Sequence, residues 1–263
     1  MSISEAIEHF ITTGEHDPHF ANWEGNVVER RRRGSADLRD VLTRIVGYRS
    51  ARGPGRRVPD DVAGQVRRRV APMVEGLLSG AEAAAFAAAL GGRVHVVTPT
   101  TFGTVIEALP PRVGWDIANL LLDDLGAPPL SDDTPELDGM CSNGQAWLLP
   151  RAFTEARPYS DVVVHEVAHL LHTVRSAELG LTGARPLLAV PPRRRETFAY
   201  ACEVWACVTR VPAERWGAEL DAFRDTATPA DARVDRDALD RVLGAALGGG
   251  GWAVIGRWAI GRR

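Results

Sequence analysis

The stretch that most constrains this chain is residues 162–171, with the sequence VVVHEVAHLL. On a helix, residues four apart lie on one face, so His165 and His169 can both present a ring nitrogen to the same point. Glu166 follows the first histidine and can reach the same point, where a carboxylate accepts a proton from water. The other residues of the run are uncharged and apolar, as a buried helix requires. This H-E-x-x-H spacing predicts a metal site inside the fold.

The alternative interpretation is a buried amphipathic helix in which the two histidines and the glutamate have structural roles only. A buried helix seldom carries two histidines and an acid unless these groups pair with each other or with a ligand. We therefore favour the metal-binding interpretation over the structural one.

Composition excludes several classes of protein. Of the 263 residues, 45% are hydrophobic and 25% charged, and the net charge of -3 argues against a nucleic-acid partner or an anionic membrane surface. All 31 basic residues are arginine. Cys141, Cys202 and Cys207 are too few and too scattered for a disulfide framework or a cysteine zinc site. With no secretion signal and no run of about 20 apolar residues, we predict a cytoplasmic protein without an integral membrane segment.

Periodicity along the chain predicts a mostly helical α+β fold. A possible capping box at Ser2 and Glu5 precedes a short first helix. A turn at Asn143 and Gly144 leads into a strand that ends at Pro150, and this strand could offer an open edge to an extended peptide. Apolar residues recur at helical spacing in several further segments, and one segment has the pattern of a buried strand. The helical segments are 38–46, 62–77, 81–90, 117–125, 195–206, 212–223 and 231–247, and the strand is 93–97.

Three regions follow from this pattern. We predict an N-terminal helical region over residues 1–91, a catalytic core over 92–247 and a C-terminal tail over 248–263. The four glycines at 248–251 predict a flexible hinge, and the apolar segment after them is expected to dock on the body of the protein.

A catalytic zinc ion takes three protein ligands and a water molecule, so the two histidines need a partner. The helix expected at 195–206 offers Glu196 and Glu203, which lie about 10 Å apart along its axis at about 1.5 Å per residue, so one ion cannot bind both. Glu196, near the helix start, is our first choice. Glu203 better suits a hydrogen bond to a ligand or an ion pair with an arginine. His172 lies on the same face as His165 but further along, and is a weaker rival.

With these residues the chain resembles the gluzincin metallopeptidases, in which H-E-x-x-H lies on one helix and a glutamate on a following helix completes the zinc site. The run ETFAYA at residues 196–201 is similar to the E-x-F-A-x-A pattern of the lethal-factor-like and related branches. The resemblance covers residues 145–208 and implies a zincin-like core with a small sheet, an active-site helix and a glutamate-bearing helix. It implies that His165, His169 and Glu196 bind Zn²⁺ and that Glu166 is the general base. The thermolysin-like branch has an acid four residues after its ligand glutamate, where this chain has Tyr200.

The activity implied is zinc-dependent hydrolysis of peptide bonds in a peptide or protein substrate, by an endopeptidase or a protein-processing peptidase. Tyr200 is our first choice for the catalytic group that stabilises the oxyanion, and Tyr159, His172 and an arginine such as Arg193 are alternatives. One rival function is a zinc hydrolase that acts on another amide. A second is an inactive zincin fold that serves as a binding or regulatory module, against which the intact Glu166 argues. The sequence predicts neither cleavage preference nor oligomeric state.

Overall fold

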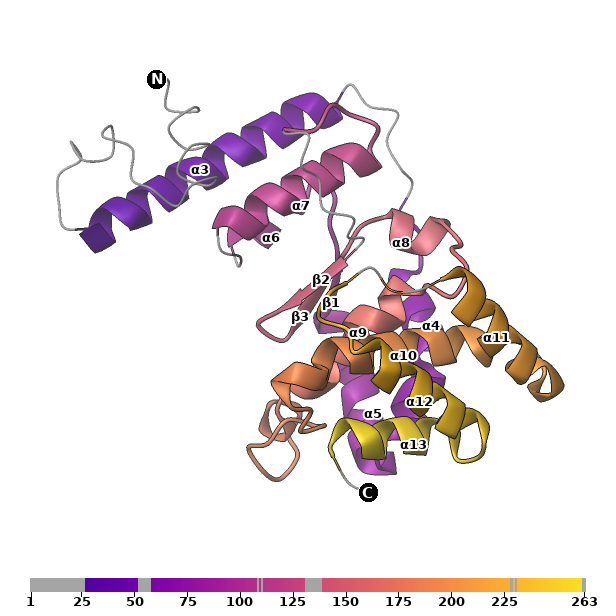
Figure 1. Cartoon of the computed structure of the whole chain (residues 1–263). Coiled ribbons are helices and arrows are strands. Elements are labelled where there is room, and N and C mark those ends of the chain that lie inside the picture. The colour runs from indigo at the N-terminus through magenta and orange to yellow at the C-terminus, as the bar shows by residue number, and fades with distance from the viewer. Residues whose placement is uncertain are drawn as a thin grey trace. The chain divides into compact units, whose positions relative to one another are not determined.

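A computed structural model describes residues 27–51, 58–107, 109, 111–130, 139–227, 229 and 231–261 (Figure 1). The predicted capping box at Ser2 and Glu5 lies outside these residues. The chain forms two compact units: the first comprises Met1–Arg57 and Val96–Leu137, the second Val58–His95 and Asp138–Arg263. The described elements are mostly helices with one small three-stranded sheet, which agrees with the predicted α+β class.

Within the described residues, the first unit is built on the helices α3 (Val27–Ser50), α6 (Phe102–Glu107) and α7 (Pro111–Asp124). Helix α3 packs against both of the others. Apolar side chains such as Leu42, Ile106 and Leu121 are buried between them. Arg39 of α3 donates hydrogen bonds of 3.0 Å to the carbonyls of Ile106 and Leu109, which satisfies two backbone acceptors at the end of α6.

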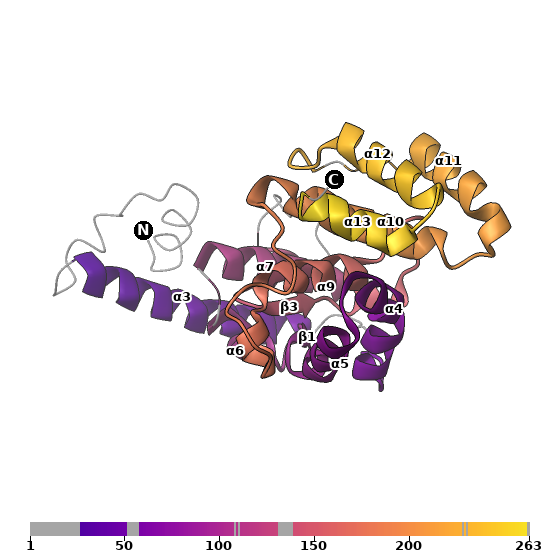
Figure 2. The ribbon, with the colours of Figure 1, turned by 90° about the horizontal axis from the view of Figure 1, so that it is seen from below.

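The second unit is organised around α9 (Val162–Thr173), the helix that carries the H-E-x-x-H residues. Helices α4 (Val62–Leu77) and α10 (Arg195–Val208) pack against α9, as do strands β2 (Gly139–Ser142) and β3 (Gln145–Leu148). Helix α10 in turn lies between α9 and two C-terminal helices, α12 (Arg236–Leu247) and α13 (Gly251–Ala259) (Figures 1 and 2). The remaining helices of this unit are α5 (Gly80–Ala89), α8 (Arg151–Thr154) and α11 (Trp216–Thr226).

The sheet has the order β1-β3-β2, with β1 at Val94–Val96. Strands β2 and β3 form an antiparallel hairpin in which Met140 pairs with Trp147. The predicted turn at Asn143 and Gly144 is confirmed, since both residues have positive φ (51° and 70°), as a tight hairpin turn requires. The prediction that the strand ending near Pro150 offers an open edge is wrong, because that strand is β3, the middle strand. Within the described residues, the two strands that pair on one side only are β1 and β2.

The C-terminal tail docks on the second unit as predicted. Helix α13 packs against α12, α4 and α10. The segment predicted as a flexible hinge forms a turn between α12 and α13, in which Gly249 and Gly250 have φ values of 137° and 94°. Residues other than glycine rarely adopt these φ values, so glycine is needed at both positions.

The two units divide the chain differently from the boundaries predicted after residues 91 and 247. Helix α4 buries Val66, Val70 and Met73 and packs against α9, α10 and α13, and α5 packs against α4. The helices at 62–77 and 80–89 therefore belong with the H-E-x-x-H helix.

None of the described helices is both long enough and apolar enough to cross a membrane.

Candidate metal centre

Helix α9 is fixed in the core by its apolar residues and capped by an acid. Asp161 Oδ1 accepts a hydrogen bond from the Val164 amide at 3.3 Å, which confirms the predicted cap. The side chains of Val163, Val167 and Leu170 are fully buried. Because these residues hold the helix in place, its remaining face presents the two histidines to α10.

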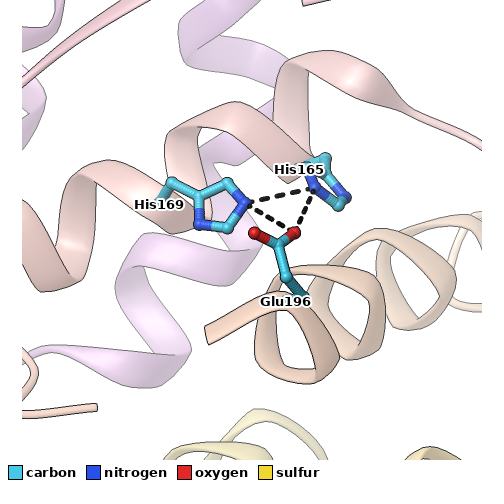
Figure 3. Close-up of side chains that lie close together, drawn as sticks. All are labelled: His165, His169 and Glu196. Carbon is cyan, nitrogen blue, oxygen red and sulfur yellow. Dashed lines mark hydrogen bonds and ion pairs between the residues drawn. The ribbon is translucent and has the colours of Figure 1, made fainter. Parts of the chain in front are cut away.

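Three predicted ligands converge at this face, as Figure 3 shows. The Nε2 atoms of His165 and His169 lie 3.2 Å apart. Glu196 Oε2, from the first turn of α10, lies 3.4 Å from Nε2 of His169 and 3.8 Å from Nε2 of His165. Ligand atoms about 2.0–2.1 Å from a tetrahedral zinc ion lie about 3.3 Å from one another. Two imidazoles and a carboxylate at this spacing therefore fit the ligand set and geometry that zinc takes.

Glu166 lies beside this cluster and is buried. Burial raises the pKa of its carboxyl group, while the nearby His165 and His169 act to lower it. Its Oε2 atom has no hydrogen-bond partner among the described residues. Buried polar atoms normally have a hydrogen-bond partner, and a water molecule at this place would supply one to Oε2 of Glu166.

Strand β2 begins against Glu166. A Cβ atom at Gly139 would lie 2.9 Å from Cγ of Glu166 and 3.0 Å from Cγ1 of Val162, closer than side-chain atoms normally approach. Glycine therefore lets the edge strand pass next to the proposed base. The sequence analysis missed Gly139, because a lone glycine among the 26 of this chain carries no local signal.

Glu203 contacts His165 on the Nδ1 side of the ring, opposite the nitrogen that faces Glu196. Its Oε2 atom lies 3.0 Å from Nδ1 of His165, and its Oε1 atom accepts hydrogen bonds from Ser160 Oγ at 2.7 Å and from the Asp161 amide at 2.8 Å. Burial lowers the pKa of His165, but the nearby carboxylates of Glu196 and Glu203 outweigh this effect and raise the pKa to about 10. The Nδ1 bond leaves Nε2 of His165 directed at Glu196.

His172 contacts His169 in the same way, on the Nδ1 side of its ring. Its Nε2 atom lies 2.9 Å from Nδ1 of His169. Burial, followed by the charge of His169, lowers the pKa of His172 to about 3, so its ring is neutral and can accept the proton of His169 Nδ1. His172 thus contacts the ring nitrogen opposite the one that faces Glu196, a position suited to support and not to oxyanion stabilisation.

The other predicted oxyanion groups lie in different surroundings. The ring of Tyr200 is edge-on to His165, with centroids 4.8 Å apart, and burial raises its pKa to about 12. Tyr159 instead donates a hydrogen bond of 3.2 Å to Glu219 of α11. Arg193 is exposed on the short turn Pro192–Arg194 before α10. Of these three candidates, Tyr200 is the one whose ring contacts a residue of the cluster.

An arginine that the sequence analysis missed also contacts the cluster. Arg233 Nη1 lies 3.0 Å from Glu196 Oε1, and Arg233 also pairs with Asp231. Burial raises the pKa of Glu196, but its interactions with His165 and His169 outweigh this effect and hold the pKa below its usual value. Arg233 lies in the loop between α11 and α12, far from Glu196 in sequence, so no local spacing could have indicated this contact.

No protein-family model, curated protein or solved structure matches this chain. The likeness to the gluzincin metallopeptidases therefore rests on the motif residues and their geometry alone, and stays a prediction.

Proposed function

We propose that this protein is a zinc-dependent hydrolase of peptide bonds with a zincin-like core. The observation that carries the proposal is the convergence of His165, His169 and Glu196 beside Glu166, a buried carboxylate with one unpartnered oxygen. A structural role alone would leave no reason for three ligand groups and a second acid to share one face.

Each residue has a distinct role in this proposal. Zinc bound by His165, His169 and Glu196 would polarise the scissile carbonyl and lower the pKa of water. Glu166 accepts the proton of the attacking water and passes it to the leaving amine. Tyr200, with a pKa of about 12, keeps its proton at neutral pH and can donate a hydrogen bond to the oxyanion.

The edge of the sheet formed by β2 supports a peptide as the substrate. Strand β2 passes next to Glu166 at Gly139, and in the described part of the chain it pairs only with β3. An extended peptide added alongside β2 would form backbone hydrogen bonds with it and bring a scissile bond to Glu166. This arrangement favours peptide hydrolysis over hydrolysis of a small amide, which needs no strand edge.

Elemental analysis and peptide cleavage test the proposal together. We expect about one zinc ion per chain, since the cluster offers one set of three ligands. A peptide library should be cleaved by the zinc-loaded protein, lose cleavage with a chelator and regain it when zinc is restored. Failure of the metal-free protein to take up zinc would overturn the proposal. Zinc uptake with hydrolysis of non-peptide amides alone would instead identify the rival amide hydrolase.

A further inference from the structure

Away from the metal centre, a cavity lies in the second unit at the N-terminal end of α9. It has a volume of about 480 Å³ and is lined by α4, by the segment 151–162 and by the C-terminal end of α10. Five arginines line it: Arg68, Arg69, Arg151, Arg157 and Arg210. The acids in its lining are Glu155 and Asp161, so the charge of the lining is positive.

Two of the arginines, Arg69 and Arg210, pair with one buried carboxylate. Arg210 pairs with Asp161, whose side chain is only 2% exposed, and Arg69 Nη1 lies 3.6 Å from Asp161 Oδ1. Arg69 is held further by a hydrogen bond of 2.8 Å to the Ala152 carbonyl. One carboxylate cannot neutralise both guanidinium groups, so this wall of the cavity stays electropositive.

Other guanidinium groups at the cavity remain accessible. The side chains of Arg68, Arg157 and Arg210 are 68%, 50% and 52% exposed. Arg68 pairs at 3.3 Å with Asp61, which lies outside the lining, and Arg157 pairs at 3.5 Å with Glu155. Exposed pairs of this kind are weak and exchange readily for a stronger anion.

We propose that this cavity binds a small phosphate ester of the size of a mononucleotide. Planar guanidinium groups bind phosphate oxygens in pairs, and several around one cavity select for phosphate over a single carboxylate. The volume lies in the range of about 300–1,000 Å³ typical of small-molecule sites. Pro72, Phe153 and Ala206 add an apolar wall on which the organic part of the ester can pack.

The cavity also shares a hydrogen-bond network with the metal centre. Ser160 and Asp161 line the cavity, and both donate to Oε1 of Glu203. The other oxygen of Glu203 is hydrogen-bonded to Nδ1 of His165. An anion that draws Arg69 and Arg210 away from Asp161 therefore acts on a residue two hydrogen bonds from a candidate ligand. Occupancy of the cavity should change the environment of the His165 ring.

Calorimetric titration of the metal-free full-length protein tests the binding step. We expect adenosine monophosphate to bind more tightly than either adenosine or inorganic phosphate. Arg210→Gln should weaken this binding by about tenfold or more, as loss of a charged hydrogen bond does. Arg68→Gln, which leaves the buried Asp161 pair intact, should weaken it in the same direction even if Arg210→Gln unfolds the protein. Arg241→Gln, an exposed arginine of α12 outside the cavity, makes the same charge change and should have no effect.

Three results would overturn the inference: no binding of adenosine monophosphate, binding no tighter than that of phosphate alone, or equal weakening by Arg241→Gln. For the coupling step, nitrogen NMR of the histidine rings should show the His165 signals move on titration in the wild-type protein but not in Glu203→Gln. Unmoved signals at saturation would exclude the coupling. Because both experiments use metal-free protein, they stay decisive even if the chain takes up no zinc.

Discussion

The carboxylate of Glu203 and the imidazole of His165 are hydrogen-bonded, with Oε2 3.0 Å from Nδ1. Helix α10 thus supplies both Glu196, on the Nε2 side of the His165 ring, and Glu203, on its Nδ1 side. In the thermolysin-like branch the acid four residues after the ligand glutamate is expected at the place of Tyr200. Here Glu203, one turn further along, is the acid that contacts the histidine, and Tyr200 packs edge-on against the same ring.

The first prediction separates ligands from supporting residues. Glu203→Ala and His172→Ala should each lower zinc affinity by about 10–100-fold, the usual cost of losing a group that orients a ligand. Glu196→Ala should lower it further, because it removes a donor to the ion. Competition titration with a chromophoric chelator measures all three. If Glu203→Ala lost zinc while Glu196→Ala kept it, the ligand assignment and the gluzincin likeness would both be wrong.

A second prediction concerns Glu166. The change Glu166→Gln keeps the size of the side chain but removes its ability to accept a proton. We expect zinc content to stay the same and turnover to fall by about 10²–10⁴-fold, the range for loss of a general acid or base. Zinc content and peptide cleavage rate are measured on the same preparation. Turnover equal to that of the wild-type protein would leave only the binding-module function.

A third prediction tests the oxyanion group with a matched pair of tyrosines. Tyr200→Phe should lower turnover by about 10²–10³-fold at unchanged zinc content, the cost of losing one oxyanion donor. Tyr159→Phe removes the same hydroxyl group from a residue that hydrogen-bonds to Glu219, so it should leave turnover unchanged. If the two variants lost activity equally, Tyr200 would have no special role and Arg233, which also contacts the cluster, would be the next candidate.

The sequence predicted the helices at the site well, because their apolar residues recur at the spacing that places them on one buried face of a helix. The spacing of His165 and His169 on one turn is likewise a local property of a helix. Contacts made by chain segments far apart in sequence could not be predicted in the same way. Arg233 reaches Glu196 from a loop after α11, and Gly139 lies against Glu166 because β2 packs against α9. The central position of β3 could not be predicted either, because the sequence of a single strand does not indicate its place in the sheet.

The last prediction concerns alkaline pH and follows from a chain without lysine. Between pH 9 and 12 the side chains that titrate are therefore mainly cysteines and tyrosines, together with His165, whose pKa is about 10 in the folded protein. Burial raises the pKa of Cys141 and Cys207 from 9.0 to about 12 and that of Cys202 well above 9.0. In this window the folded state holds protons that the unfolded state has lost, so the free energy of unfolding falls as pH rises. Stability from these groups is fully present below pH 9 and is lost progressively between pH 9 and about 12.

Urea unfolding of the metal-free, reduced protein at a series of pH values measures this loss. Each thiol contributes at most about 1.4 kcal/mol per pH unit to the slope. Cys202→Ala should lower the free energy of unfolding at pH 7, since it leaves a small cavity in the core. Above pH 9, however, the free energy of unfolding of this variant should fall less steeply with pH than that of the wild-type protein, by at most the contribution of one thiol. Parallel slopes in the two proteins would mean that the Cys202 thiol does not hold its proton in the folded state. The opposite sign, a stability that rises above pH 9, would contradict all three raised pKa values at once.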